Sequence, residues 1–230
     1  MATTGTFGFA PALSEIVLNA FSRIGIRRTE LTAQHLADAA TESNLTLVRM
    51  SNHQPNLWTS SLITVPLVTG TATYTLPAET VAILVAYITV TSGASSTDRV
   101  LGPVSTVEYA SFPKKTQTGV PTTFWFDRQI TPRITVWQVP NSSASYSLKL
   151  QTVRQVQDAS MPLGTGLDLP YRAYDAFTAD LAHRLSRHYA KDLEAVRKGD
   201  ANDAWKEFMD QDQEDVPMFI VPGLASYTGL

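Results

Sequence analysis

The spacing of apolar residues predicts two helices near the N-terminus. Apolar side chains recur there at intervals of three and four residues, which gathers them on one face of a helix. The first face consists of Leu13, Ile16, Val17, Ala20, Phe21 and Ile24. A second helix is expected to begin at 29–32, and its apolar face consists of Leu36, Ala40, Leu45, Leu47, Val48 and Met50.

The same spacing predicts two helices near the C-terminus. The first has an apolar face that consists of Tyr174, Phe177, Leu181, Leu185 and Tyr189. Gly199 and Asp200 are expected to end this helix, because glycine interrupts a helical pattern. A last helix is expected over 203–214, with its inner face formed by Ala204, Trp205, Phe208 and Met209.

Between these helical regions the pattern is typical of strands. From Ser51 to Val100 the only charged side chains are Glu79, Asp98 and Arg99, while Thr, Ser and Val dominate. Strands are expected at 62–65, 73–76, 81–90, 123–127, 133–137 and 146–151, and the last three predict an antiparallel meander. A short helix is expected over 104–112, because Ser105 lies three residues before Glu108, as in a capping box.

This order of elements predicts an α+β fold. Helices from the two ends of the chain can pack on each other only where the strands leave the bundle as a single insertion. We therefore expect a helical bundle of residues 1–55 and 165–215, a large antiparallel β insertion of residues 56–164, and an extended C-terminal arm of residues 216–230.

The C-terminal arm carries no charged side chain and is interpreted as a binding segment. Its two prolines exclude a helix, and its apolar residues would expose a contiguous patch in a free monomer. The arm either folds back on its own sheet or reaches a partner, and we favour an extended arm laid along another subunit. The residues expected to bind a portal or a neighbouring copy are Val216, Pro217, Met218, Phe219, Ile220, Val221, Pro222, Leu224 and Tyr227.

Composition excludes several classes of protein. A formal net charge of −3 and an isoelectric point near 5.8 argue against a generic nucleic-acid-binding domain, which would be basic overall. The absence of cysteine excludes disulfides and thiolate metal sites. No apolar run reaches the roughly 18 residues that cross a bilayer, and no signal peptide is evident. We expect a soluble protein that is made in the cytoplasm and is not inserted in a membrane.

Motifs for catalysis or metal binding are absent from the sequence. It contains no G-x-S-x-G, G-x-x-x-x-G-K-[ST] or G-x-G-x-x-G. His183 and His188 are five residues apart, which is not the spacing of a zinc-binding helix, and the histidines are interpreted as solvated helix residues. We expect no enzyme activity, no metal site and no cofactor.

Two groups of residues could still contact a ligand. The basic residues Arg27, Arg28, Lys114 and Lys115 are candidates for contacts with DNA or a protein partner, although the two lysines could equally cap a loop. Trp125 and Trp137 could stack on a ligand. We interpret both tryptophans as core residues instead, because large aromatic side chains mostly belong to cores.

Several segments resemble a known family. They are L-P-A-E-T-V-A-I-L-V-A-Y-I at 76–88, R-V-L-G-P-V-S-T-V-E-Y-A-S-F-P at 99–113, G-V-P at 119–121, T-F-W-F-D-R at 123–128 and P-R-I-T-V-W-Q-V-P at 132–140. This series resembles the head-to-tail adaptor proteins of short-tailed bacteriophages, also called tail tubular protein A or gateway proteins. The resemblance extends over about residues 10–215 and does not include the arm.

The resemblance implies a structural protein of the virion. Proteins of this family have a helical bundle, a β-sandwich-like insertion and an extended C-terminal segment. Twelve copies form a ring below the portal protein at the head-tail junction, extend the DNA channel and offer a platform to the tail nozzle or tail-tube protein. The alternative is a carbohydrate- or ligand-binding β module of a tail or receptor-binding component, which would require Trp125 or Trp137 to be exposed.

Overall fold

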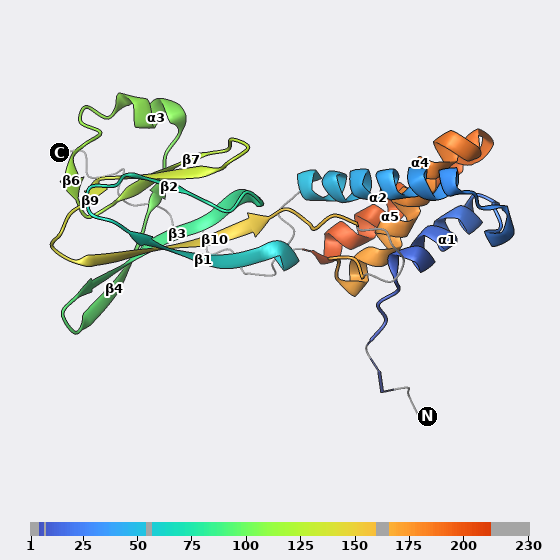
Figure 1. Ribbon diagram of the computed structural model, residues 1–230, viewed down its shortest axis with the longest axis horizontal. Coiled ribbons are helices and arrows are strands. Elements are labelled where there is room, and N and C mark those ends of the chain that lie inside the picture. Colours follow the sequence, from blue (N-terminus) through green and yellow to red (C-terminus); the bar gives the residue numbers. More distant parts are fainter. Residues whose placement is uncertain (1–4, 7, 54–56, 160–165, 213–230) are drawn as a thin grey trace, which may run out of the picture.

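The computed structural model describes residues 5–6, 8–53, 57–159 and 166–212. It confirms the α+β class. Figure 1 shows an elongated molecule, with the strands gathered at one end and the long helices at the other. The chain passes from helices to strands after residue 53 and returns to helices after Arg154, so the strands form one insertion between the helices.

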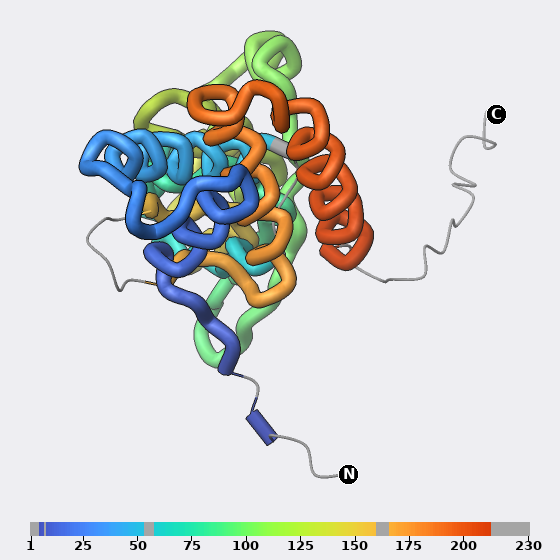
Figure 2. Tube along the Cα trace, turned by 90° about the vertical axis from the view of Figure 1, so that its right-hand side faces the viewer, coloured from blue at the N-terminus to red at the C-terminus, as the bar shows by residue number. Residues whose placement is uncertain are grey.

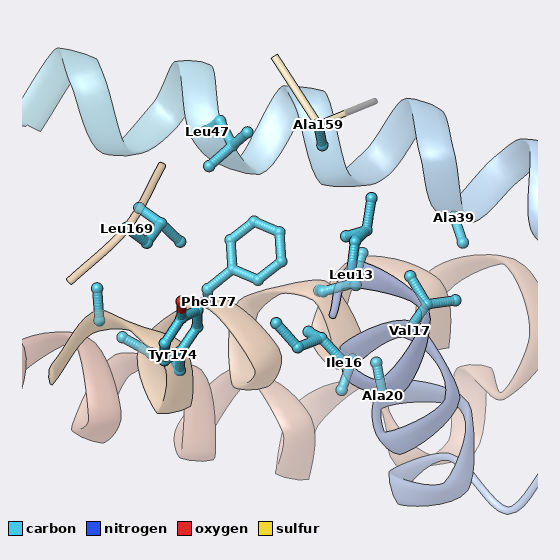
Figure 3. Close-up of a cluster of buried hydrophobic side chains, with 14 of the residues drawn as sticks. Leu13, Ile16, Val17, Ala20, Ala39, Leu47, Ala159, Leu169, Tyr174 and Phe177 are labelled. Carbon is cyan, nitrogen blue, oxygen red and sulfur yellow. The ribbon is translucent and has the colours of Figure 1, made fainter. Parts of the chain in front are cut away.

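The helical end is built around one central helix. Its elements are α1 (Leu13–Arg23), η1 (Arg28–Glu30), α2 (Ala33–His53), η3 (Tyr171–Ala173), α4 (Tyr174–Tyr189), η4 (Lys191–Leu193) and α5 (Glu194–Gln211). Helices α1, α2 and α5 each pack against α4. As predicted, Phe177, Leu181 and Leu185 of α4 are fully buried. In Figure 3, Phe177 points toward Leu47 of α2 and lies beside Leu13 of α1.

The predicted inner face of α2 is wrong at two positions. Leu45 and Val48 are 46% and 42% exposed, whereas Thr46 and Leu47 are buried. The helix is therefore rotated so that polar residues enter the bundle and two large apolar residues leave it. The physical reason is a set of charged contacts with α4, which is described with the candidate site below.

The predicted break between the last two helices lies in the wrong place. The chain turns at 190–193, through η4, and α5 then continues through Gly199 and Asp200. A Cβ atom added at Gly199 would meet no atom within 4 Å, so neither packing nor backbone geometry requires a glycine there. One glycine costs a helix only about 1 kcal/mol, which the packing of Ala201 and Phe208 offsets.

The strands form two main sheets. In the first sheet the order is β1 (Ser60–Leu67), β10 (Ser145–Arg154), β3 (Thr80–Ser92) and β4 (Ser95–Val100), all antiparallel. In the second sheet the order is β2 (Thr73–Thr75), β8 (Arg133–Trp137), β7 (Thr123–Asp127) and β5 (Gly102–Pro103), with β5 parallel to β7. Two short strands, β6 (Thr118–Gly119) and β9 (Val139–Pro140), pair in parallel. A short turn, η2 (Leu57–Thr59), precedes β1.

The two sheets share one hydrophobic cluster, as in a sandwich. Its buried residues are Leu76, Ala86, Ile88, Leu101, Phe124, Ile134, Val136, Tyr146, Leu148 and Leu150. The predicted meander is only half correct. β7 and β8 form a hairpin in the second sheet, but β10 crosses to the first sheet and lies between β1 and β3. Residue pattern alone could not show this, because Leu148 and Leu150 face the shared core from either sheet.

The helical end has a separate hydrophobic cluster, to which α1, α2, α4 and α5 all contribute. The expected boundaries between bundle and insertion, at 55/56 and 164/165, lie in segments outside the described residues and stay a prediction. The expected short helix is confirmed as α3 (Thr106–Ser111), and the Ser105 hydroxyl accepts a hydrogen bond from the Glu108 amide at 3.1 Å.

Candidate partner-binding surfaces

Every charged side chain of α2 contacts α4. Asp38, Glu42 and Arg49 are the only Asp, Glu, Lys or Arg residues in this helix. Arg184 Nη1 donates to one carboxylate oxygen of Glu42 at 3.2 Å, and His188 Nε2 lies 3.2 Å from the other. The side chain of Glu42 is only 16% exposed, so these contacts lie largely between the two helices.

Asp180 of α4 accepts hydrogen bonds from two arginines at the same interface between α2 and α4. Arg49 Nη1 donates to its Oδ1 at 2.5 Å, and Arg184 Nε donates to its Oδ2 at 3.2 Å. The Asp180 side chain is 7% exposed. A charge buried to this degree is tolerated only where it is paired, so any rotation of α2 that unpaired Arg49 would be costly. The ionic contacts therefore fix which face of α2 points outward.

The third charged residue of α2 bonds to the last turn of α4. The hydroxyl of Tyr189 donates to a carboxylate oxygen of Asp38. Burial and this hydrogen bond raise the pKa of Tyr189 from 10.0 to about 12. Since the folded-state pKa is raised, the contribution of this contact to stability is fully present below pH 10 and is lost as the pH rises toward 12.

The outer face of α2 is uncharged from end to end. Its exposed residues are Ala33, Gln34, Ala37, Thr41, Leu45, Val48 and Asn52. From Gln34 onward they recur at intervals of three and four residues, so they form one continuous stripe about 27 Å long. The outward face of a surface helix is ordinarily charged or polar, and apolar stripes on such helices are ordinarily buried. We call this stripe the uncharged face of α2.

A second group of contacts joins the strands to the helices. Arg154, the last residue of β10, donates to both carboxylate oxygens of Asp168 at 2.5 and 3.0 Å. This paired hydrogen bond lowers the pKa of the Asp168 carboxyl and raises that of Arg154. Trp58 Nε1 donates to the backbone oxygen of Asp168 at 3.1 Å. The entering and leaving chains are thus held together where the two ends of the molecule meet.

The end of α5 is fixed beside this junction. Arg172 Nη2 donates to Oδ1 of Asp212 at 2.6 Å, and the Asp212 side chain is fully buried. The rings of Phe208 and Trp58 lie 5.7 Å apart, edge to face. Residue 212 is the last described residue, and these contacts hold the end of α5 close to Trp58, two residues before β1.

Comparison with known proteins identifies the family. The model of the family described as SU10 adaptor protein matches residues 12–221, which include both the helical and the strand segments. The chain belongs to the SU10 adaptor protein family. This membership supports the phage head-tail adaptor and the structural, non-enzymatic role predicted from the sequence resemblance. A restriction to short-tailed phages stays a prediction.

The other comparisons add little to the family assignment. Among solved structures, the neck of an empty GTA particle, computed with C6 symmetry, matches this SU10 adaptor family member at 13% identity. The match covers 83% of this chain and 84% of that chain with a TM-score of 0.27, which is a distant likeness. No curated protein matches the chain.

The basic residues predicted from the sequence do not form one site in this SU10 adaptor family member. Arg27 and Arg28 lie at η1, beyond α1, and border a hollow of about 430 Å³ on the helical end. Lys114 and Lys115 follow α3 at the strand end, far from η1 in Figure 1. Lys115 Nζ donates to the backbone oxygens of Ala110 and Phe112, so it does cap the end of α3. All four residues are exposed.

The prediction that Trp125 and Trp137 fill the core is wrong. Both are half-buried on the outer surface of the second sheet, because they alternate with the core residues Phe124 and Val136. The α3 segment covers them. Tyr109 stacks on Trp125 with ring centroids 5.3 Å apart, and Trp137 Nε1 donates to the backbone oxygen of Lys114 at 3.0 Å.

The histidines were also interpreted wrongly in one case. His183 is 3% exposed and faces Asp180 and Arg187 instead of solvent. Its pKa is lowered, chiefly because burial disfavours the charged imidazolium and also because Arg187 is close. Within the described ranges, no group of three or more acidic or histidine side chains could hold a metal ion. The described helices include none that is long and apolar enough to span a bilayer.

The uncharged face of α2 was not predicted from the sequence. The nine arm residues predicted to bind a partner lie outside the described residues. One signal for the uncharged face was present in the sequence. The charges of α2 recur at Asp38, Glu42 and Arg49, intervals of four and seven, which is the spacing of a single helix face. A helix with its charges on one face has an uncharged face elsewhere.

Proposed function

We propose that this chain is the head-to-tail adaptor of a bacteriophage virion. In this role, copies of the chain form a ring of twelve below the portal protein, extend the DNA channel and provide the platform for the tail nozzle or tail-tube protein. The observation that carries the proposal is the match of the SU10 adaptor family to residues 12–221. Localisation follows: the protein is made in the host cytoplasm and resides at the head-tail junction.

The separation of helices and strands into two ends of the molecule supports different binding partners for the two ends in this ring. We assign residues 1–55 and 165–215 to the bundle that packs around the ring and meets the portal, and residues 56–164 to the insertion that carries the next tail component. The paired hydrogen bonds between Arg154 and Asp168 hold the bundle and the insertion together where they meet. The insertion also has exposed apolar side chains that could contact a partner, Val107 at 80% and Ile130 at 98% exposure.

The four basic residues are proposed contacts with DNA or a partner. Arg27 and Arg28 project from the helical end, and Lys114 and Lys115 from the strand end, so the two pairs would meet different partners. Their exposure supports this role, because none of the four is consumed by an ion pair within the described part of the chain. Channel DNA would be met through its phosphates, without sequence readout.

The C-terminal arm, residues 216–230, is the proposed grip on the portal or on neighbouring copies. Its fifteen residues contain no charged side chain, and Met218, Phe219, Ile220 and Val221 are consecutive large apolar residues. Such a segment gains binding energy by burying apolar area, at about 25 cal/mol per Å².

Deletion of the arm tests this role. A chain that ends at Asp215 is expected to co-assemble with purified portal protein at least about tenfold more weakly than the full chain, because the apolar contact is lost. The matched control keeps the length of the arm and replaces Phe219 and Ile220 by Ser. It should show most of the same loss, and undiminished portal binding by both variants would contradict a grip on the portal.

The alternative function, a carbohydrate- or ligand-binding module, gains no support from the fold. It required Trp125 or Trp137 to present a free ring. Instead, the ring of Tyr109 lies parallel to that of Trp125. The ring centroids of Phe112 and Trp137 are 4.5 Å apart. These side chains bind the α3 segment to the sheet, and we retain the adaptor role alone.

A further inference from the structure

We infer that the uncharged face of α2 is the docking site for the C-terminal arm of a second copy of this chain. This inference rests on the proposed ring and names the acceptor surface for the arm within it. It concerns a contact between copies, and the arm can fail to make this contact while the ring still binds the portal.

The uncharged face needs an uncharged occupant. Leu45 and Val48 lie near its centre at 46% and 42% exposure, and Ala37 and Thr41 continue it toward the N-terminus of α2. DNA is excluded as the occupant, because phosphates are bound by Lys and Arg and this face has neither. A charged protein surface is equally unsuitable, because its charges would lose solvation without gaining a partner.

The arm has the matching chemistry. Residues 216–230 contain no charged side chain and include Met218, Phe219, Ile220 and Val221. The described exposed residues of α5, in contrast, include Lys198, Asp203, Lys206, Glu207 and Asp210, so that helix is a poor complement to α2. Fully extended, fifteen residues reach about 50 Å, which is more than the roughly 27 Å length of the uncharged face.

The position of α5, which precedes the arm, favours docking between copies. Figure 2 shows α2 and α5 on opposite sides of α4. The arm follows α5, whose end is held by the Arg172–Asp212 pair and by Phe208 on Trp58. In a rotationally symmetric ring, each contact joins one side of a copy to a different side of the next copy. A ring that places the α5 side of one copy against the α2 side of the next brings the end of α5 close to the uncharged face of its neighbour.

Introduced cysteines can test this contact directly, because the natural chain has none. Two single variants, Leu45→Cys and Phe219→Cys, are mixed under mild oxidation, first as full chains at rising concentration and then after portal protein has been added. We expect a disulfide-linked pair of chains. The matched control is Val196→Cys mixed with Phe219→Cys, since Val196 is 54% exposed on α5. The Leu45 pair should form at least about tenfold faster, because docking raises its effective concentration.

Each other outcome overturns the inference, and three of these outcomes name a different occupant. An internal disulfide in the double variant, without any linked pair from the mixed single variants, would mean that the chain covers its own α2. A disulfide-linked Leu45→Cys homodimer that forms as fast as the mixed Leu45→Cys and Phe219→Cys pair would mean that two α2 helices meet. If portal protein alone shields the thiol of the Leu45→Cys variant from maleimide, the portal is the occupant. Equal rates for the Leu45 and Val196 pairs, or no disulfide in either condition, would mean no specific docking. Portal binding that persists in these cases would leave the adaptor role intact.

Discussion

Asp180 determines, at the scale of single residues, which side of α2 faces outward. Its carboxylate is buried between Arg49 of α2 and Arg184 of its own helix. The residue pattern predicted that Leu45 and Val48 would be buried, because an apolar residue on a helix is ordinarily the better candidate for a core. It could not show that Arg49, their neighbour in sequence, has a buried partner 131 residues away.

Replacement of Asp180 by Ala is expected to destabilise the protein by about 3 kcal/mol. The substitution leaves Arg49 and Arg184 partly buried without their shared partner, and uncompensated buried charge carries a cost of this size. Urea unfolding measures the change. The control is Asp175→Ala, which removes an exposed pair with Arg23 and should cost less than about 1 kcal/mol. Equal losses in the two variants would contradict the structural role of Asp180.

At the scale of elements, local signals predicted well and long-range pairing did not. Ser105 caps α3 as predicted, because a capping box involves residues only three apart. The six expected strands all exist within a few residues of their expected positions. The predicted pairing of β10 with β8 was wrong. The sheet that β10 joins depends on contacts with β1 and β3, which lie more than 50 residues earlier in the sequence. Similarly, α5 continues through Gly199 because tertiary packing outweighs propensity.

Replacement of two glycines by alanine is expected to change the stability of the protein in opposite directions. Gly199→Ala should stabilise the protein by about 0.5–1 kcal/mol, because it lies inside α5 and the added methyl group meets open space. Gly25→Ala should destabilise it by about 1–2 kcal/mol, because Gly25 follows α1 with φ of +86°, where an L side chain is strained. Thermal unfolding compares both with the natural chain. A destabilised Gly199→Ala variant would mean that α5 is interrupted there after all.

At the scale of the whole molecule, two hydrophobic clusters are joined by a small set of polar contacts. The helical cluster and the strand cluster each have their own buried residues, and Arg154, Asp168 and Trp58 connect the two ends. The order of elements in the sequence was sufficient to predict this arrangement, because it left only one way for the terminal helices to meet. The surfaces for partners were less predictable, since they depend on which side chains the fold leaves exposed.

The stoichiometry of the complex with portal protein tests the adaptor role most directly. Mass measurement is made on the full chain alone, on portal protein alone and on their mixture. The proposed function predicts a discrete complex in which twelve copies of this chain are added to one portal ring, and none of this mass should be gained when the chain is mixed with an unrelated ring of similar size. A mixture whose components keep their separate masses at all concentrations would contradict the proposed function.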